Sequence, residues 1–211
     1  MKRIYFVRHG ITGGNEINAY QKLDTSLSEK GRSQANFLAE RFSKIIFDVL
    51  ITSTFERAQE TAHIIAQKTG HNIILEELFH EILRPSVVRG KIRTDPEVIE
   101  AMRVAKSCWK EEGKKHSDEE NIHDLKNRAI KALDYLISRD EEIMVVVTHG
   151  TTLKMMLAVM MRGKNLQLDF WDEINEFFFP ENTGITWAEY DNKYHPNRWQ
   201  LITWNDHAHL G

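Results

Sequence analysis

The residues with the clearest chemical potential stand where apolar, strand-like segments end. Segment 2–7 is followed by Arg8 and His9, and His149 comes shortly after segment 143–147. The carboxyl ends of parallel strands meet at one edge of an α/β sheet, which is where such sheets place their ligands. The sequence therefore predicts that these cationic and imidazole side chains share one site.

A second arginine is expected at the same edge. Arg57 falls in the first turn of a helix predicted after the strand-like segment 47–52. Arginine presents a planar fork of N–H donors that matches phosphate oxygens, and helix N-termini add further donors. Histidine can act as a covalent nucleophile when one ring nitrogen is deprotonated and the other is held by a hydrogen bond. This combination favours phosphoryl transfer, with arginines matching the charge of the transferred group.

A leaving alkoxide would need a proton donor, and Glu81 is the carboxylate nominated for that role. Burial beside an anion is expected to raise the pKa of Glu81 and to keep it protonated near neutral pH. The segment that follows is rich in cations, namely Arg84, Arg89, Lys91 and Arg93. Two interpretations of these cations remain open: contact with an anionic substrate, or a solvated surface.

Taken in order, these residues resemble the histidine phosphatase (phosphoglycerate mutase-like) superfamily. The resemblance spans nearly the whole chain and rests on five short motifs: Arg8-His9-Gly10 with Thr12 and Asn15, Leu27-Ser28-Glu29-Lys30-Gly31 with Gln34-Ala35, Ser53-Thr54-Phe55-Glu56-Arg57-Ala58 with Thr61-Ala62, Glu81, and Thr148-His149-Gly150. The C-terminal run 205–210 also looks like the tail of a bacterial-type subgroup.

The resemblance implies a role for each of these positions. His9 would be the phosphorylated nucleophile, and Glu81 would be the proton donor and then the base for the water that hydrolyses phosphohistidine. The implied substrate-binding residues are Arg8, Asn15, Arg57, His149 and Gly150, with His149 also counted as catalytic. No cofactor and no metal are implied, and the implied substrate is a small phosphorylated metabolite.

The sequence departs from the family pattern in two places. Ile11 stands where many family members carry Glu. This difference leaves the residues implied in phosphoryl transfer unchanged, and we expect it to alter the rim of the pocket. The segment after Asn15 lacks the Gly- and Trp-containing pattern of cofactor-dependent mutases. We therefore expect a metal-independent phosphomonoester hydrolase acting through phospho-His9. The alternatives are a phosphomutase, a catalytically silent phospho-ligand binding protein, and a metal-dependent hydrolase using His207 and His209.

Alternation of strand-like and helical patterns predicts the architecture that would hold these residues. The order strand, helix, strand, helix, strand up to residue 75 favours a parallel sheet with crossover helices. We expect an α/β three-layer sandwich with a mainly parallel sheet, folded as a single domain over residues 1–211. Segment 77–118 is expected as a lid-like insertion that forms part of the pocket. Local patterns predict individual elements as well. We expect a capping box at Ser53–Glu56 and helices after Asp95-Pro96 and over 122–136 and 151–161. Two final strands are expected over 182–190 and 198–204, joined by a turn at 191–193.

Composition narrows the functional classes. The chain has 211 residues, a formal net charge of −3 and a pI of about 6.4, so no global basic field favours nucleic acid or a membrane surface. The single cysteine, Cys108, excludes an internal disulfide. No apolar run approaches the roughly 20 residues of a spanning helix. We expect a cytoplasmic protein with no membrane or nucleic-acid partner; an oligomer is allowed but not indicated.

Overall fold

A six-stranded mixed sheet forms the centre of the computed structural model, which describes residues 1–191 and 198–211. The strand order is β3-β2-β4-β1-β5-β6. The four strands from β3 to β1 run parallel, and β5 is antiparallel to both of its neighbours, β1 and β6. The strand bounds are β1 Lys2–Arg8, β2 Val49–Thr52, β3 Ile73–Leu75, β4 Ile143–Thr148, β5 Ile185–Tyr190 and β6 Trp199–Asp206. The predicted α/β class with a mainly parallel sheet is confirmed.

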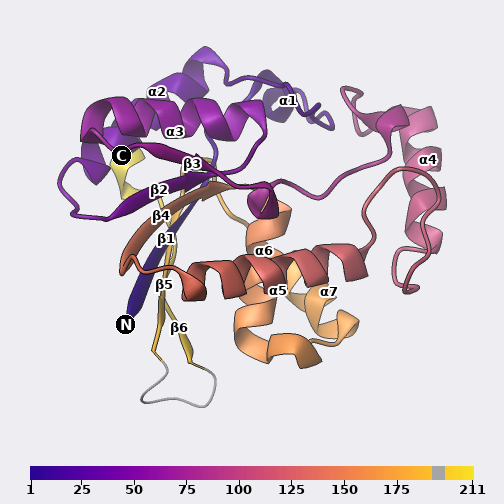
Figure 1. Cartoon of the computed structure of the whole chain (residues 1–211). Coiled ribbons are helices and arrows are strands. Elements are labelled where there is room, and N and C mark those ends of the chain that lie inside the picture. The colour runs from indigo at the N-terminus through magenta and orange to yellow at the C-terminus, as the bar shows by residue number, and fades with distance from the viewer. Residues whose placement is uncertain (192–197) are drawn as a thin grey trace.

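Helices cover both faces of this sheet (Figure 1). Their bounds are α1 Gly13–Glu16, α2 Glu29–Phe42, α3 Glu56–Thr69, α4 Pro96–Ser107, α5 Ile122–Ser138, α6 Gly150–Arg162 and α7 Leu168–Phe177. Successive strand side chains point to opposite faces. Ile4 and Phe6 therefore join the core beneath α5, α6 and α7, whereas Tyr5 and Val7 join the core beneath α2 and α3. The central strands β1, β2 and β4 contain apolar runs because both of their faces are buried.

The strand order brings the two His-Gly motifs together. Although β1 and β4 are far apart in sequence, they are neighbours in the sheet, with Arg8 in register with Thr148. β2 pairs with the other side of β4, so the chain leaving β2 emerges at the same edge. His9, His149 and the start of α3 are thus placed side by side by the topology.

Several expected boundaries differ from the structure. The predicted capping box at Ser53 is wrong: α3 begins at Glu56 after Phe55, and no side chain caps it. The hydroxyl of Ser53 instead accepts a hydrogen bond from the Phe55 N–H. Asp95 precedes α4 without a side-chain capping bond.

Other differences concern elements that the sequence patterns missed or only partly covered. The glycine-rich turn after Thr12 contains the one-turn helix α1, closed by a capping box between Thr12 and Asn15. Helix α7 was not predicted. In the turn expected at 191–193, residues 192 and 193 lie outside the described residues. Helix α3 ends at Thr69, and Gly70 follows it with a positive φ of 77°, which suits glycine.

Segment 77–118 is mostly irregular and carries α4 at a distance from the sheet (Figure 1). It is joined to the loop after α1 by backbone hydrogen bonds, including Tyr20 N–H to Lys91 O at 2.9 Å. A small apolar cluster of Val88, Val98 and Met102 packs beside Tyr20. This attachment brings the segment over the carboxyl ends of the strands.

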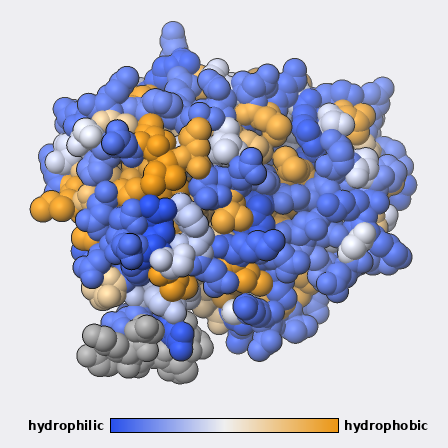
Figure 2. Space-filling model, viewed as in Figure 1, coloured by the Kyte–Doolittle hydropathy of each residue, from blue (hydrophilic) through white to orange (hydrophobic). Residues whose placement is uncertain are grey.

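The surface in Figure 2 is mainly hydrophilic, with an apolar patch over the region that β2, β3 and α3 occupy in Figure 1. β3 is an edge strand, and its Leu75 is exposed. Within residues 1–191 and 198–211, no helix combines the length and apolarity required to cross a membrane.

Candidate active site

His9 is held in one orientation at the end of β1. Its side chain is buried, and its Nδ1 lies 2.7 Å from the carbonyl oxygen of Gly10. A carbonyl only accepts, so Nδ1 carries the proton and Nε2 keeps its lone pair. Burial, and then the charges of Arg57 and Arg8, lower the pKa of His9 well below its usual value. The ring is therefore neutral at physiological pH, with Nε2 available as a nucleophile.

Two arginines surround this nitrogen. The Nε of Arg57 donates to His9 Nε2 at 3.2 Å, and its Nη1 donates to Lys22 O at 3.0 Å. Burial lowers the pKa of Arg57 to about 10, which still leaves the guanidinium charged at neutral pH. Arg8 Nη1 donates to Pro180 O at 2.6 Å, while its Nε is buried with no protein partner in the described part of the chain. Arg8 Nε is thus a donor left for a bound anion.

His149 contributes a further buried donor. Its ring centroid is 5.0 Å from that of His9, and its Nε2 lies 2.8 Å from the hydroxyl oxygen of Ser53. The other nitrogen, Nδ1, is buried and unpartnered among the described residues. Burial, followed by the charge of Arg57, lowers the pKa of His149 well below its usual value. The Ser53 hydroxyl oxygen accepts from the Phe55 N–H, so its own hydrogen can be donated to His149 Nε2. With Nε2 as the acceptor, Nδ1 carries the ring proton and can donate it to an anion.

Close backbone packing explains two of the glycines in the motifs. A Cβ on Gly31 would lie 2.0 Å from Ile11 O, and one on Gly10 would lie 2.7 Å from Gly31 O. The N-terminus of α2 can therefore approach the chain just after His9 only because both positions lack a side chain. From the other side, Asn182 Nδ2 donates to His9 O at 2.8 Å. These contacts fix the backbone that carries the imidazole.

Glu81 lies at the N-terminus of α6. Its carboxylate accepts hydrogen bonds from the N–H groups of Thr151 at 3.0 Å, Thr152 at 3.1 Å and Ile82 at 2.9 Å. Burial alone raises the pKa of Glu81, but these N–H groups and the charges of Arg84 and Arg57 outweigh it, so the net pKa is lowered. The expectation of a raised pKa is wrong for the ligand-free protein, in which Glu81 is ionised.

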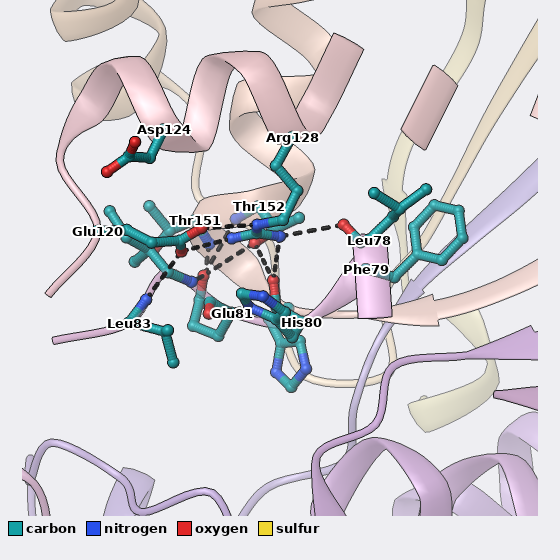
Figure 3. Close-up of polar contacts among 12 residues, drawn as sticks. Leu78, Phe79, His80, Glu81, Leu83, Glu120, Asp124, Arg128, Thr151 and Thr152 are labelled. Carbon is teal, nitrogen blue, oxygen red and sulfur yellow. Dashed lines mark hydrogen bonds and ion pairs between the residues drawn. The ribbon is translucent and has the colours of Figure 1, made fainter. Parts of the chain in front are cut away.

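A buried ion pair holds the backbone on both sides of Glu81 (Figure 3). Arg128 of α5 donates to His80 O at 2.7 Å and to Leu78 O at 3.0 Å, and it pairs with Glu120 at 2.7 Å. Glu120 in turn accepts from the Leu83 N–H at 3.0 Å. The two side chains are only 10% and 12% exposed. We call this pair, Arg128 and Glu120, the Glu81 brace.

Arg8, His9, Arg57 and Glu81 open into one cavity of about 80 Å³, whereas His149 is buried beside His9 and is not among the lining residues. It is lined by fifteen residues: Arg8, His9, Asn15, Tyr20, Gln21, Leu23, Phe55, Arg57, Glu81, Ile82, Leu83, Arg84, Arg89, Arg93 and Thr151. Asn15 is thus at the cavity, where its Oδ1 accepts from the N–H and hydroxyl of Thr12. Gly150 opens α6 beside Arg8 rather than lining the cavity. A larger cavity, of about 730 Å³ between α5, α6 and β6, contains none of the predicted site residues.

Three residues of the site were missed by sequence reasoning. Ser53 was interpreted as a helix cap, although its place at the end of a strand, like that of His9, was a usable signal. Tyr20 and Gln21 line the cavity from an irregular loop, where no periodic pattern marks them. His207 and His209, considered as metal ligands, contact Asn205 O and Thr183 Oγ1 instead. In the described ranges, no three His, Cys, Asp or Glu side chains are grouped to hold a metal ion.

Comparison with known proteins finds one family. The family model described as "Histidine phosphatase superfamily (branch 1)" matches residues 4–207. The chain is 28% identical over 189 residues to "Putative phosphoserine phosphatase 2" of Hydrogenobacter thermophilus, covering 88% of each chain. It is 28% identical over 163 residues to "Probable phosphoglycerate mutase GpmB" of Erwinia tasmaniensis, covering 76% of this chain and 75% of the other. A solved structure of a mycobacterial glucosyl-3-phosphoglycerate phosphatase with VO3 superimposes with a TM-score of 0.76 at 25% identity, covering 97% of this chain and 99% of that one.

Proposed function

The chain belongs to branch 1 of the histidine phosphatase superfamily, and on that premise we propose that it hydrolyses small phosphomonoesters through a covalent phosphohistidine on His9. The single observation that carries the proposal is the orientation of the His9 ring. Nδ1 is tied to Gly10 O, and Nε2 faces Arg57 beside two unpartnered donors, Arg8 Nε and His149 Nδ1. This arrangement supports His9 Nε2 as the nucleophile and the neighbouring donors as contacts for the transferred group.

In the first step, the lone pair of His9 Nε2 forms a bond to phosphorus as the ester P–O bond breaks. Arg8, Arg57 and His149 donate to the equatorial oxygens, where charge is spread in such a transition state. The leaving alkoxide takes a proton from Glu81. Because Glu81 is ionised in the free protein, this proton must be acquired as the anionic phosphoryl group binds and raises its pKa.

In the second step, the Glu81 carboxylate accepts a proton from a water molecule. The resulting hydroxide bonds to phosphorus, the P–N bond breaks, and inorganic phosphate leaves. His9 returns to its neutral form with Nδ1 still donating to Gly10 O. Asn15 and the N-terminus of α6, which begins at Gly150, are proposed as additional contacts for the bound group.

A phosphomutase is the second candidate, and the similarity to a relative named as a phosphoglycerate mutase favours it. In that case phospho-His9 would pass its group to a second substrate hydroxyl instead of water. Adding an acceptor alcohol separates the two: a hydrolase releases inorganic phosphate in proportion to substrate consumed, whereas a mutase forms the transferred ester.

The test is hydrolysis of an aryl phosphate by the wild type and by His9→Ala, each with and without a chelator. We expect wild-type turnover that resists the chelator and His9→Ala turnover reduced by at least about a thousandfold. Labelled substrate should leave an acid-labile, base-stable phosphoprotein in the wild type alone. Near-normal turnover in His9→Ala would contradict the nucleophile assignment, and loss of activity with chelator would contradict metal independence. A cytoplasmic location stays a prediction.

A further inference from the structure

The last strand of the sheet ends at the same edge as the site. Because β5 is antiparallel to both β1 and β6, β6 runs in the direction of β1, and its last two residues, Asn205 and Asp206, lie at the edge where Arg8 ends β1. Asp206 forms an ion pair with Arg41 of α2. The side-chain amide of Asn205 instead contacts segment 179–184, which connects α7 to β5.

Both ends of the Asn205 amide hold this segment. Its Oδ1 accepts from the Glu181 N–H at 2.7 Å, and its Nδ2 donates to Phe179 O at 3.3 Å. A Cβ on Gly184 would lie 2.1 Å from this Oδ1, so the amide occupies the space that the glycine leaves. The φ of Asn205 is 52°, in the left-handed region that Asn tolerates better than most residues. Position 205 thus needs a positive φ together with a side chain that both donates and accepts.

Segment 179–184 in turn holds the end of β1. Pro180 O accepts from Arg8 Nη1 at 2.6 Å, and Asn182 Nδ2 donates to His9 O at 2.8 Å. Within the described residues, the bond to Pro180 O is the one hydrogen bond that the Arg8 guanidinium makes. The orientation of this guanidinium therefore depends on where segment 179–184 places the Pro180 carbonyl.

The second arginine beside His9 is held by other groups. Arg57 donates through Nη1 to Lys22 O and through Nε to His9 Nε2, so its guanidinium does not depend on segment 179–184. Arg8, by contrast, is oriented by a neutral carbonyl rather than by a carboxylate. Its positive charge is not neutralised by the group that orients it and stays available for a bound anion. A shift of segment 179–184 should therefore act on Arg8 and spare Arg57.

We propose that Asn205 is a positioning residue for Arg8. By holding segment 179–184, it places the Pro180 carbonyl where that carbonyl turns the Arg8 guanidinium toward the transferred phosphoryl group. Asn205 itself contacts neither the substrate nor the nucleophile. The inference rests on the proposed function for the identity of the reaction, but its effect on oxyanion binding can be measured without turnover.

The test is a double-mutant cycle between Asn205 and Arg8, with orthovanadate, a tetrahedral oxyanion like phosphate, as the probe. Asn205→Gly removes the amide and accepts the positive φ, so the backbone is not strained. Calorimetry should show vanadate binding weakened about threefold to tenfold, the range of one lost hydrogen bond. In an Arg8→Gln background the same change should have less than about a twofold effect, whereas in an Arg57→Gln background it should keep its full effect.

Turnover gives a second measurement. Arg8 is proposed to act on the phosphoryl group and not on the leaving group, so Asn205→Gly should lower kcat for alkyl and aryl phosphates by the same factor, about tenfold. The ratio of alkyl to aryl turnover should stay at its wild-type value. The calorimetric stoichiometry reports the fraction of folded protein, which separates loss of fold from weaker binding.

Asn18→Gly is the matched control. The φ of Asn18 is 53°, nearly that of Asn205, but its side chain is exposed and makes no hydrogen bond within the described residues. It should leave vanadate binding and turnover unchanged. Asn205→Asp is the second variant if Asn205→Gly fails to fold, because it keeps the side-chain size and the Oδ1 acceptor and loses only the donor to Phe179 O. Its effect on vanadate binding should likewise vanish in the Arg8→Gln background.

Three results would overturn the positioning role. They are unchanged vanadate binding in Asn205→Gly, an effect of equal size with and without the Arg8 guanidinium, and an equal effect of Asn18→Gly. If the wild type binds vanadate with the expected coupling but releases phosphate from no ester, the proposed function fails and the positioning role stands.

Discussion

His9 and His149 follow two neighbouring strands in the same local sequence, His-Gly, yet their ring nitrogens have different partners. His9 is bound through Nδ1 to the adjacent carbonyl, which leaves Nε2 facing Arg57. His149 is bound through Nε2 to Ser53, which leaves Nδ1 without a partner in the described part. The first ring offers a lone pair and the second can offer a proton. Gly10 belongs to the His9 motif, but Arg57 and Ser53 lie outside both motifs, so the His-Gly pairs alone do not determine the difference between the two rings.

At Glu81, we predict a substitution effect that depends on the leaving group. Glu81→Gln keeps the size of the side chain but cannot deliver a proton, so alkyl phosphates, whose alkoxides are poor leaving groups, should lose about 10²–10⁴ in kcat. An aryl phosphate with a nitrophenolate leaving group needs little protonation and should lose much less in the first step. Burst kinetics on both substrates separate that step from dephosphorylation. An equal loss in the first step for both would count against the acid role.

At the scale of elements, the Glu81 brace joins the start of α5 to the segment that carries the proposed general acid, Glu81 (Figure 3). We predict that Glu120→Gln destabilises the fold by about 3–5 kcal/mol, because it leaves the buried Arg128 charge without its partner. The same change weakens the contact with the Leu83 N–H, because a neutral amide oxygen is a weaker acceptor than a carboxylate, and we expect it to shift Glu81. Beyond the loss of stability, kcat for alkyl phosphates should therefore fall more than kcat for aryl phosphates.

An exposed ion pair supplies the control for this prediction. Glu100 and Arg103 form a bidentate pair on α4, and both are mostly exposed. Glu100→Gln should leave the free energy of unfolding nearly unchanged, because the pair is exposed and screened by solvent, and should leave the ratio of alkyl to aryl turnover unchanged. Urea unfolding gives the first quantity and steady-state kinetics the second. If Glu120→Gln lowers stability without changing that ratio, the brace is structural only.

Local sequence patterns were sufficient to predict much of the fold and most residues of the candidate site. β-branched runs marked β1 and β4, and helical spacing marked the buried face of α5, because both patterns record burial directly. Ser53 and Tyr20 escaped because their roles arise from contacts between loops distant in sequence. The lowered pKa of Glu81 in the ligand-free protein was not foreseen, since two of its three N–H donors depend on how α6 meets residue 81. Such contacts are set by tertiary packing and leave no periodic trace.

For the whole molecule, overall charge and local charge have opposite signs. The formal net charge is −3, yet five arginines line the cavity, with Glu81 as the carboxylate among its described lining residues. This arrangement concentrates a positive potential where field lines are focused by low-dielectric walls, which raises the local concentration of small anions. This distribution of charge supports the proposal of a small anionic substrate.

The buried histidines also make the stability of the whole fold depend on pH. Burial, followed by neighbouring positive charge, places the pKa values of His9 and His149 well below their usual value in the folded state, whereas in the unfolded chain they stay near 6.5. Below pH 6.5 these two histidines therefore bind protons in the unfolded chain but stay unprotonated in the folded protein. The stability that the two neutral histidines contribute is present above pH 6.5 and is lost as the pH falls.

We predict that the free energy of unfolding decreases between pH 6.5 and 5 by about 1.4 kcal/mol per pH unit for each such histidine. Glu81 and Asp206 do not contribute in this window, because their lowered pKa values move their effect below pH 4.5. His9→Ala should make the decrease of the unfolding free energy with falling pH shallower, by the contribution of one histidine. Urea unfolding at pH 7.5, 6.5, 5.5 and 5.0 measures this dependence. An unchanged slope would mean that folded His9 takes up a proton as readily as the unfolded chain does. A ring that protonates so readily would lose the lone pair on Nε2 at mildly acidic pH, so the same measurement bears on the nucleophile itself.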